Sequence, residues 1–134
     1  VKGNTDSEVF FFLALTYGLE NNPKAAIEKT ILRVKEACKA HKIPFEITLS
    51  IALSNGSELY TASYAVGMEY NSQFYSTHAE CMQEIHGDFA KIPANGVVVV
   101  SEPLDYSLEN WKEMPKSSFA TIGNGNIQIE SLTL

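Results

Sequence analysis

The chain has 134 residues, an apolar fraction of 45% and a formal net charge of −6, without any cluster of Lys or Arg. This is the length of one ordinary domain with a buried core, and the acidic excess argues against a nucleic-acid partner. The longest apolar run, 9–15, is far shorter than the roughly 20 residues that cross a bilayer, so we expect no membrane partner and a cytoplasmic location.

The first predicted element is a helix that begins after Thr5. Thr5 and Glu8 stand three residues apart ahead of an apolar run, which is the pattern of a capping box. Asp6 then occupies the first helical position, where the helix dipole favours its ionised form and the side chain is free to face a cleft. The pattern predicts a fixed anion that could bind a small cation, such as the ammonium group of an amino acid. A purely structural role is the alternative, because acidic residues are common in first turns.

Two helices are predicted in succession. The first is apolar on nearly all sides through Val9–Leu15, which predicts burial on more than one face, between its own sheet and either a second copy or a missing half. Gly18 and the cluster 21–23 end it, and Asn22 with Pro23 begins a second helix that runs to about Ala40. Its apolar stripe repeats at helical spacing, so Cys38 is predicted to be a core residue; the stripe consists of Ile27, Ile31, Val34 and Cys38. His41, in the last turn, is expected to interact with the terminal carbonyls.

The rest of the chain has the period of β-strands. Residues 45–54 alternate between apolar and polar, Asn55-Gly56 is a strong hairpin signal, and 58–65 returns as a second strand. Further strands are predicted at 73–77, at the β-branched run 97–100, and at 119–122 and 127–129, where a terminal hairpin turns at 123–126. Trp111, which lies between Leu108 and Met114 in the sequence, is expected to pack as a lid on the core. These patterns alone indicate an α+β fold with an antiparallel sheet.

The segment 77–93 has the only side chains that suggest a metal. They are His78, Glu80, Cys81, Glu84 and His86. Structural zinc sites usually pair ligands two to four residues apart, and the HExxH spacing is not met. We therefore expect a surface loop or short helix there, no metal site and no cofactor.

Several motifs together resemble the C-terminal half of a class II glutamine amidotransferase domain. They are TDSEVFFFLAL from Thr5, VVVVSEPLD ending at Asp105, Trp111 and Pro115, and the resemblance runs from Gly3 to about Ile129. It implies part of an αββα N-terminal nucleophile hydrolase sandwich, with 1–134 as a single or partial domain. It also implies that Asp6 binds the α-amino group of glutamine or a γ-glutamyl substrate, while Glu102 and Asp105 are expected to be structural hydrogen-bonding residues.

The chain departs from this family in the parts that perform catalysis. The resemblance implies an N-terminal cysteine nucleophile, an arginine and an Asn-Gly pair ahead of the aspartate motif, whereas this chain starts at Val1. We therefore expect no catalytic residue here, and expect a missing N-terminal segment or a partner chain to supply them, which leaves open whether the chain is an enzyme. The Asn-Gly pairs at 55–56 and 124–125 follow the motif and are expected at hairpin tips, and Ser63 stands where family members commonly have arginine. The alternative is a non-catalytic association module that forms a homo-oligomer through the apolar first helix, residues 10–12 above all.

Overall fold

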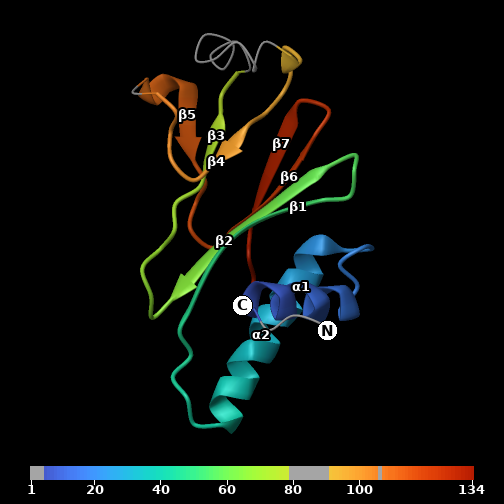
Figure 1. Ribbon diagram of the computed structural model, residues 1–134, viewed down its shortest axis with the longest axis vertical. Helices are drawn as coiled ribbons and strands as arrows, with labels where there is room; N and C mark the ends of the chain where they lie inside the picture. Colours follow the sequence, from blue (N-terminus) through green and yellow to red (C-terminus); the bar gives the residue numbers. More distant parts are fainter. Residues whose placement is uncertain (1–4, 79–90, 106) are drawn as a thin grey trace. The chain divides into compact units, whose positions relative to one another are not determined.

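The computed structural model of the chain describes residues 5–78, 91–105 and 107–134. It divides into two compact units. The first contains the helices α1 and α2 with the last three residues, 132–134, and the second contains all the strands, 47–131 (Figure 1). The fold is α+β with antiparallel sheets, as the sequence predicts.

Helix α1 spans Asp6–Thr16, and its two ends follow from local side chains. Thr5 is the N-cap in an extended conformation, and its Oγ1 accepts a hydrogen bond from Glu8 N at 3.3 Å. At the other end Gly18 has a φ of +87°, in the left-handed region, and Leu19 N donates to Ala14 O in the turn that ends the helix. Both predicted ends are thereby confirmed.

Helix α2 spans Pro23–Ala40, and Asn22 Oδ1 caps it by accepting from Ala25 N at 3.1 Å. Its predicted stripe is fully buried only in the first half, at Ile27 and Ile31, while Cys38 is half-buried and is therefore not a core residue. The helix ends in a turn in which Lys42 has a φ of +55° and Ile43 N donates to Cys38 O.

The carbonyl of Ala37 is bonded by the main-chain amide of His41, at 3.0 Å. The sequence led us to expect an interaction with the terminal carbonyls at this residue, and the structure shows that the backbone makes it. Within the same unit the chain end returns to α2, because Thr133 N donates to Glu28 Oε1 at 2.8 Å. That oxygen also lies 2.8 Å from Lys24 Nζ, so one carboxylate fixes the tail and pairs with a lysine.

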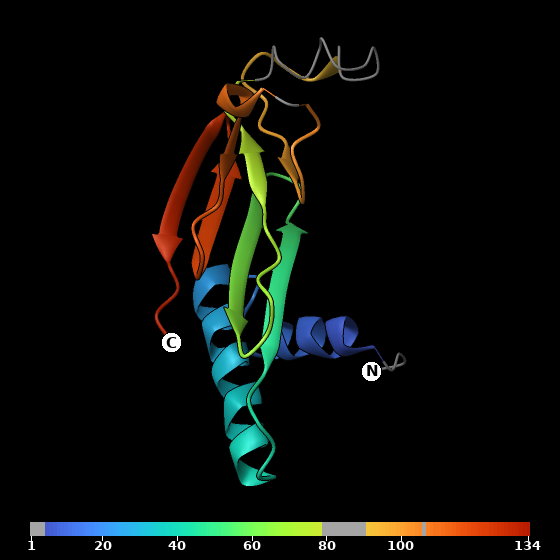
Figure 2. The same cartoon turned by 90° about the vertical axis from the view of Figure 1, so that its left-hand side faces the viewer.

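The larger sheet has four antiparallel strands in the order β1-β2-β6-β7 (Figure 2). They are β1 (Ile47–Ser54), β2 (Leu59–Val66), β6 (Ser118–Gly123) and β7 (Asn126–Ser131). The β6–β7 turn is the predicted tight hairpin, with Asn124 and Gly125 both at positive φ. The β1–β2 connection is longer than a two-residue turn, since Ser54 pairs with Leu59 and Asn55 Oδ1 accepts from the amides of Ser57 and Glu58.

The smaller sheet has three antiparallel strands in the order β4-β3-β5. They are β3 (Phe74–Ser76), β4 (Val99–Val100) and β5 (Trp111–Glu113), the last preceded by a short 3-10 helix, η2, at Leu108–Asn110. Only two of the four consecutive valines pair in the ladder, because Ser76 exchanges hydrogen bonds with Val98 through its backbone amide and its Oγ. Strand β4 is therefore shorter than the predicted one.

The two sheets pack face to face within this unit. Met114, Ala120 and Ile122 are buried in a cluster to which both sheets contribute, together with Val97 and Val99. The alternate valines, Val98 and Val100, pack instead against Trp111 on the opposite side of the small sheet. The valine run is thus covered on both sides, as predicted.

Trp111 packs on a hydrophobic core cluster, as expected. The indole is buried, with 5% of its surface exposed, and it packs with Phe74, Ile92 and the two outer valines, whereas Met114 belongs to the cluster between the sheets. Trp111 begins β5 and Met114 directly follows that strand, so the two side chains, three residues apart in extended chain, lie on opposite faces.

Among the described residues, no helix combines the length and the apolar composition that a membrane span requires.

Candidate functional site

The strongest candidate from the sequence, Asp6, lies exposed in the first turn of α1. Its Oδ1 accepts hydrogen bonds from Ser7 N at 2.7 Å and from Ser7 Oγ at 3.3 Å. In the described part of the chain its Oδ2 has no hydrogen-bond partner. The carboxylate is therefore held by one oxygen while the other is available to a donor from outside.

The charge around this carboxylate suits a cationic ligand. Glu8 is a second acidic residue of the same turn, and the last turn of α1 contains no basic residue. An ammonium group could donate to Asp6 Oδ2 in a charge-assisted hydrogen bond, which is shorter and stronger than a neutral one.

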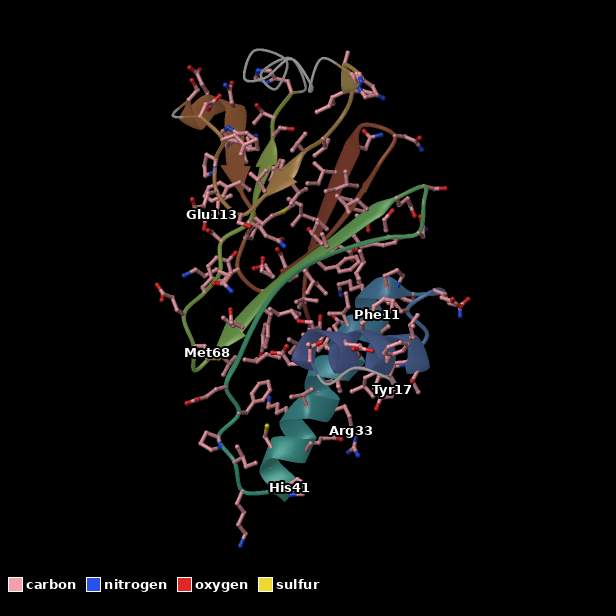
Figure 3. All side chains as sticks on the ribbon, in the orientation of Figure 1. Phe11, Tyr17, Arg33, His41, Met68 and Glu113 are labelled. Atoms are coloured by element: carbon pink, nitrogen blue, oxygen red, sulfur yellow. The ribbon has the colours of Figure 1, made fainter. Side chains whose placement is uncertain are left out.

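Helix α1 carries large apolar side chains that solvent reaches. Val9 is 49% exposed, and Phe11 and Phe12 are each 40% exposed with their rings packed edge to face at 5.7 Å. Figure 3 labels Phe11 on the helix and Tyr17 at its C-terminal end. Ala14 is the only residue of α1 that is fully buried. The described residues thus leave much of this apolar surface uncovered. The predicted burial on more than one face requires a second copy or a missing half to cover the helix, and it stays a prediction.

Asp105, in the SEPLD motif, accepts hydrogen bonds from three donors that lie next to the small sheet. Its Oδ1 accepts from Ser107 N at 2.9 Å and from Trp111 Nε1 at 3.1 Å, while its Oδ2 accepts from Asn110 Nδ2 at 3.1 Å. These bonds, that from the Asn110 carboxamide first, hold the pKa of the Asp105 carboxyl below its usual value. The structural hydrogen-bonding role expected of Asp105 is confirmed.

The same role is not seen for Glu102, which is exposed and has no hydrogen bond to any described residue.

A polar surface between the sheets was missed by the sequence reasoning. Ser50, Ser63, Ser118 and Ser131 stand opposite one another in a row across the four strands. Ser63 is 1% exposed, and its Oγ has no partner within the described residues. The signal available beforehand was the serine or threonine at alternate positions of β1 and β2.

Gln73 lies beside this serine row. It is 5% exposed, its Nε2 donates to Ile51 O at 3.1 Å, and its Oε1 has no partner in the described part of the chain. Its backbone carbonyl accepts from Met114 N at 2.8 Å. Gln73 therefore joins the two sheets, and it leaves an unpaired acceptor between them.

Most of the suggested metal ligands fall outside the described residues: Glu80, Cys81, Glu84 and His86. His78 is described, and its Nδ1 lies 2.8 Å from Thr77 Oγ1. Within the ranges that the structure describes, no three His, Cys, Asp or Glu side chains come together as metal ligands.

Both Asn-Gly pairs lie in the hairpin connections where the sequence places them, at 55–56 and 124–125.

The chain was compared with known families, curated proteins and solved structures. No protein-family model matches this sequence, and no curated protein does. A solved structure described as a glutamine aminotransferase class-II domain protein from Silicibacter pomeroyi superimposes with a TM-score of 0.78 at 32% sequence identity. The match covers 98% of this chain and 53% of that one, so this chain spans about half the length of its relative.

Proposed function

Since this chain belongs to the class II glutamine amidotransferase-like domains, we propose that it supplies the substrate-binding half of such a domain. In this proposal Asp6 binds the α-amino group of glutamine or of a γ-glutamyl compound. The nucleophile and the oxyanion donors come from a further segment or chain that completes an αββα sandwich. The two packed antiparallel sheets and the two helices support this architecture.

The observation that carries the proposal is the state of the Asp6 carboxylate. It is exposed, it is fixed through one oxygen to Ser7, and its other oxygen is unpaired among the described residues. A carboxylate bonded on both oxygens to its own backbone would have only a capping role. This one has a free acceptor at the point where the helix begins, which is what an amine ligand needs.

The contribution of Asp6 to catalysis is one of positioning. A charge-assisted hydrogen bond to the amine fixes one end of the substrate, so that the γ-carboxamide at the other end is presented to the nucleophile in one orientation. Attack on that carboxamide carbon, and departure of ammonia, would be carried out by groups outside this chain. The bond to the amine is the same in the ground state and the transition state, so its loss should raise KM more than it lowers kcat.

The test is reconstitution with the segment that carries the N-terminal cysteine. Hydrolysis of L-glutamine would be compared in wild type, Asp6→Asn and Glu8→Gln. The second variant removes an equal charge from the same turn and keeps the hydrogen-bonding shape of a capping residue. In a site closed by the second segment, losing a charged hydrogen bond of about 1.5 to 3 kcal/mol raises KM about 10- to 150-fold.

An unchanged KM in Asp6→Asn, or an equal rise in Glu8→Gln, would overturn the role given to Asp6.

A second candidate function is supported by α1. The exposed Val9, Phe11 and Phe12 favour a non-catalytic association module that uses this helix as its contact surface. Replacing Phe12 by Asp should then abolish association seen by sedimentation, whereas Asp6→Asn should leave it unchanged. A chain that neither associates through α1 nor binds glutamine would refute both candidates.

A further inference from the structure

The chain contains three Asn-Gly sequences, at 55–56, 95–96 and 124–125, and the structure places them in different surroundings. Asparagine is a thermolabile residue, and a following glycine leaves its side chain open to attack by the next main-chain nitrogen, since glycine has no Cβ to hinder the approach. The three sequences share this chemistry, so a difference between their rates of deamidation comes from the fold. All three asparagines are exposed, and burial therefore does not distinguish them.

The nitrogen that would attack is hydrogen-bonded at two of the three sites. Gly56 N donates to Ser54 Oγ at 3.0 Å, and Gly96 N donates to Pro93 O at 2.7 Å. Gly125 N has no hydrogen-bond partner within the described residues. Attack requires the N–H to lose its proton, and a bonded N–H must first give up its acceptor, which costs free energy. In the described part of the chain, the third site alone presents an unbonded nitrogen.

The carboxamide under attack is held firmly at the first site. Asn55 Oδ1 accepts from Ser57 N at 2.9 Å and from Glu58 N at 2.8 Å. Asn55 Nδ2 donates to Tyr60 OH at 2.9 Å. The carboxamide can therefore turn toward the next nitrogen only after three hydrogen bonds break. The side chain of Asn124, in contrast, makes no hydrogen bond with the residues that the structure describes.

A single peptide flip brings Asn124 into the reactive conformation. Asn124 and Gly125 have φ of +50° and +75°, which is the pattern of a type I′ turn, with ψ of the first residue about +30°. Flipping the peptide between them gives type II′, the other turn of two-residue hairpins, with ψ of the first residue about −120°. A five-membered imide ring requires the next nitrogen to eclipse Cβ about the Cα–C bond, and a ψ near −120° provides that alignment.

The surroundings of the turn oppose this flip only weakly. Among the described residues, the flipping peptide loses a single hydrogen bond, which Asn126 Nδ2 donates to Asn124 O at 3.4 Å. The ladder pair of Gly123 and Asn126, which closes the hairpin, lies outside the flipped peptide and is kept. Type II′ favours glycine at its first central position, so the flipped turn is a minor state whose population sets the rate.

We propose that Asn124 deamidates spontaneously in the folded chain, whereas Asn55 and Asn95 are protected. Gly125 N forms a bond to Asn124 Cγ as the Cγ–Nδ2 bond breaks, and ammonia leaves with the proton of the Gly125 amide. Water then adds to one of the two carbonyls of the succinimide ring, which opens to aspartate or isoaspartate. Each event adds one negative charge, and isoaspartate lengthens the main chain of the turn by one carbon atom.

The experiment follows the folded chain in mildly alkaline buffer, with peptide mapping by mass spectrometry at the three sites. Asn124 should convert several-fold faster than Asn95 and at least ~10-fold faster than Asn55, because one and four hydrogen bonds, respectively, oppose the reaction there. The same chain unfolded in urea is the control, in which the three sites should react at similar rates. Equal rates in the folded chain, or a slower rate at Asn124 than at either other site, overturn the proposal.

Tyr60→Phe tests the cause of the protection. It removes the acceptor of Asn55 Nδ2 and keeps the stacked ring. The rate at Asn55 should rise about 2- to 5-fold, while the rate at Asn124 should stay unchanged. Ser54→Ala, which frees the attacking nitrogen, should act in the same direction. If neither variant raises the rate at Asn55, hydrogen bonding is not the cause of the difference and the proposal is overturned. These outcomes are independent of the proposed substrate site.

Discussion

Replacing Gly125 by alanine should destabilise the strand unit through two separable effects. Gly125 has a φ of +75°, a conformation that costs an L-residue roughly 1–2 kcal/mol. A Cβ built there would also lie 2.8 Å from both Asn95 Cβ and Asn95 O, closer than real Cβ contacts. Relief requires movement of backbone, and overpacking of this kind costs about 1–3 kcal/mol. Gly125→Ala should therefore lower the free energy of unfolding by about 2–5 kcal/mol.

Gly56 provides the matched control. It has a φ of +91°, but a Cβ added there would meet nothing within 4 Å. Gly56→Ala should therefore lose only the conformational part, roughly 1–2 kcal/mol. Urea unfolding followed by the fluorescence of Trp111, the one tryptophan, measures both variants. Equal losses would refute the packing of the β6–β7 turn against Asn95.

Three further outcomes follow from hydrogen bonds and backbone angles. Asn22→Ala should lower the free energy of unfolding by about 1 kcal/mol, since the amide of Ala25 loses its cap, and thermal unfolding would show a reduced melting temperature. Lys42→Gly should raise it by roughly 1 kcal/mol, because Lys42 occupies the left-handed region at the end of α2; no gain in urea unfolding would contradict the turn described there. For Asp105 the folded pKa is lowered, so its stabilisation is complete above the unfolded pKa, near 3.8, and is lost as pH falls through the folded pKa. In Asp105→Ala, Trp111 Nε1 also loses its acceptor. The free energy of unfolding of this variant should therefore differ from that of wild type by a constant amount above pH ~5 and by a decreasing amount in acid. A difference that does not change with pH would contradict this.

The helices could be predicted with their ends because the interactions that fix those ends are local. The hydroxyl of Thr5 and the carboxamide of Asn22 each bond an amide three residues ahead, and both patterns are visible in the sequence. The same holds for the Asn124–Gly125 turn. The β1–β2 hairpin was also predictable at Asn55-Gly56, and the Asn55 side chain, which binds the amides of Ser57 and Glu58, stabilises the loop between the two strands.

The features that could not be predicted depend on contacts between distant residues. Which face of the small sheet Trp111 covers is fixed by its register with Ser76 and by Ile92 and Val98, which a local pattern does not contain. The paired serines of the large sheet and the unpaired Oε1 of Gln73 require the strand order β1-β2-β6-β7, which hydrophobic alternation alone leaves open. In the candidate site, by contrast, the position of Asp6 is set by its own helix start and was predictable.

The most direct test of the central claim is whether Asp6 recognises an amine. Binding to the chain itself can be followed by NMR titration with L-glutamine and with 4-carbamoylbutanoic acid, the same molecule without its α-amino group. For an exposed charge pair of up to about 1 kcal/mol, Asp6→Asn should weaken glutamine binding about 2- to 5-fold and leave binding of the deaminated compound unaffected, whereas Glu8→Gln should leave binding of both ligands unaffected. Equal affinities of wild type and Asp6→Asn for glutamine, or an equal loss with both ligands, would contradict the account.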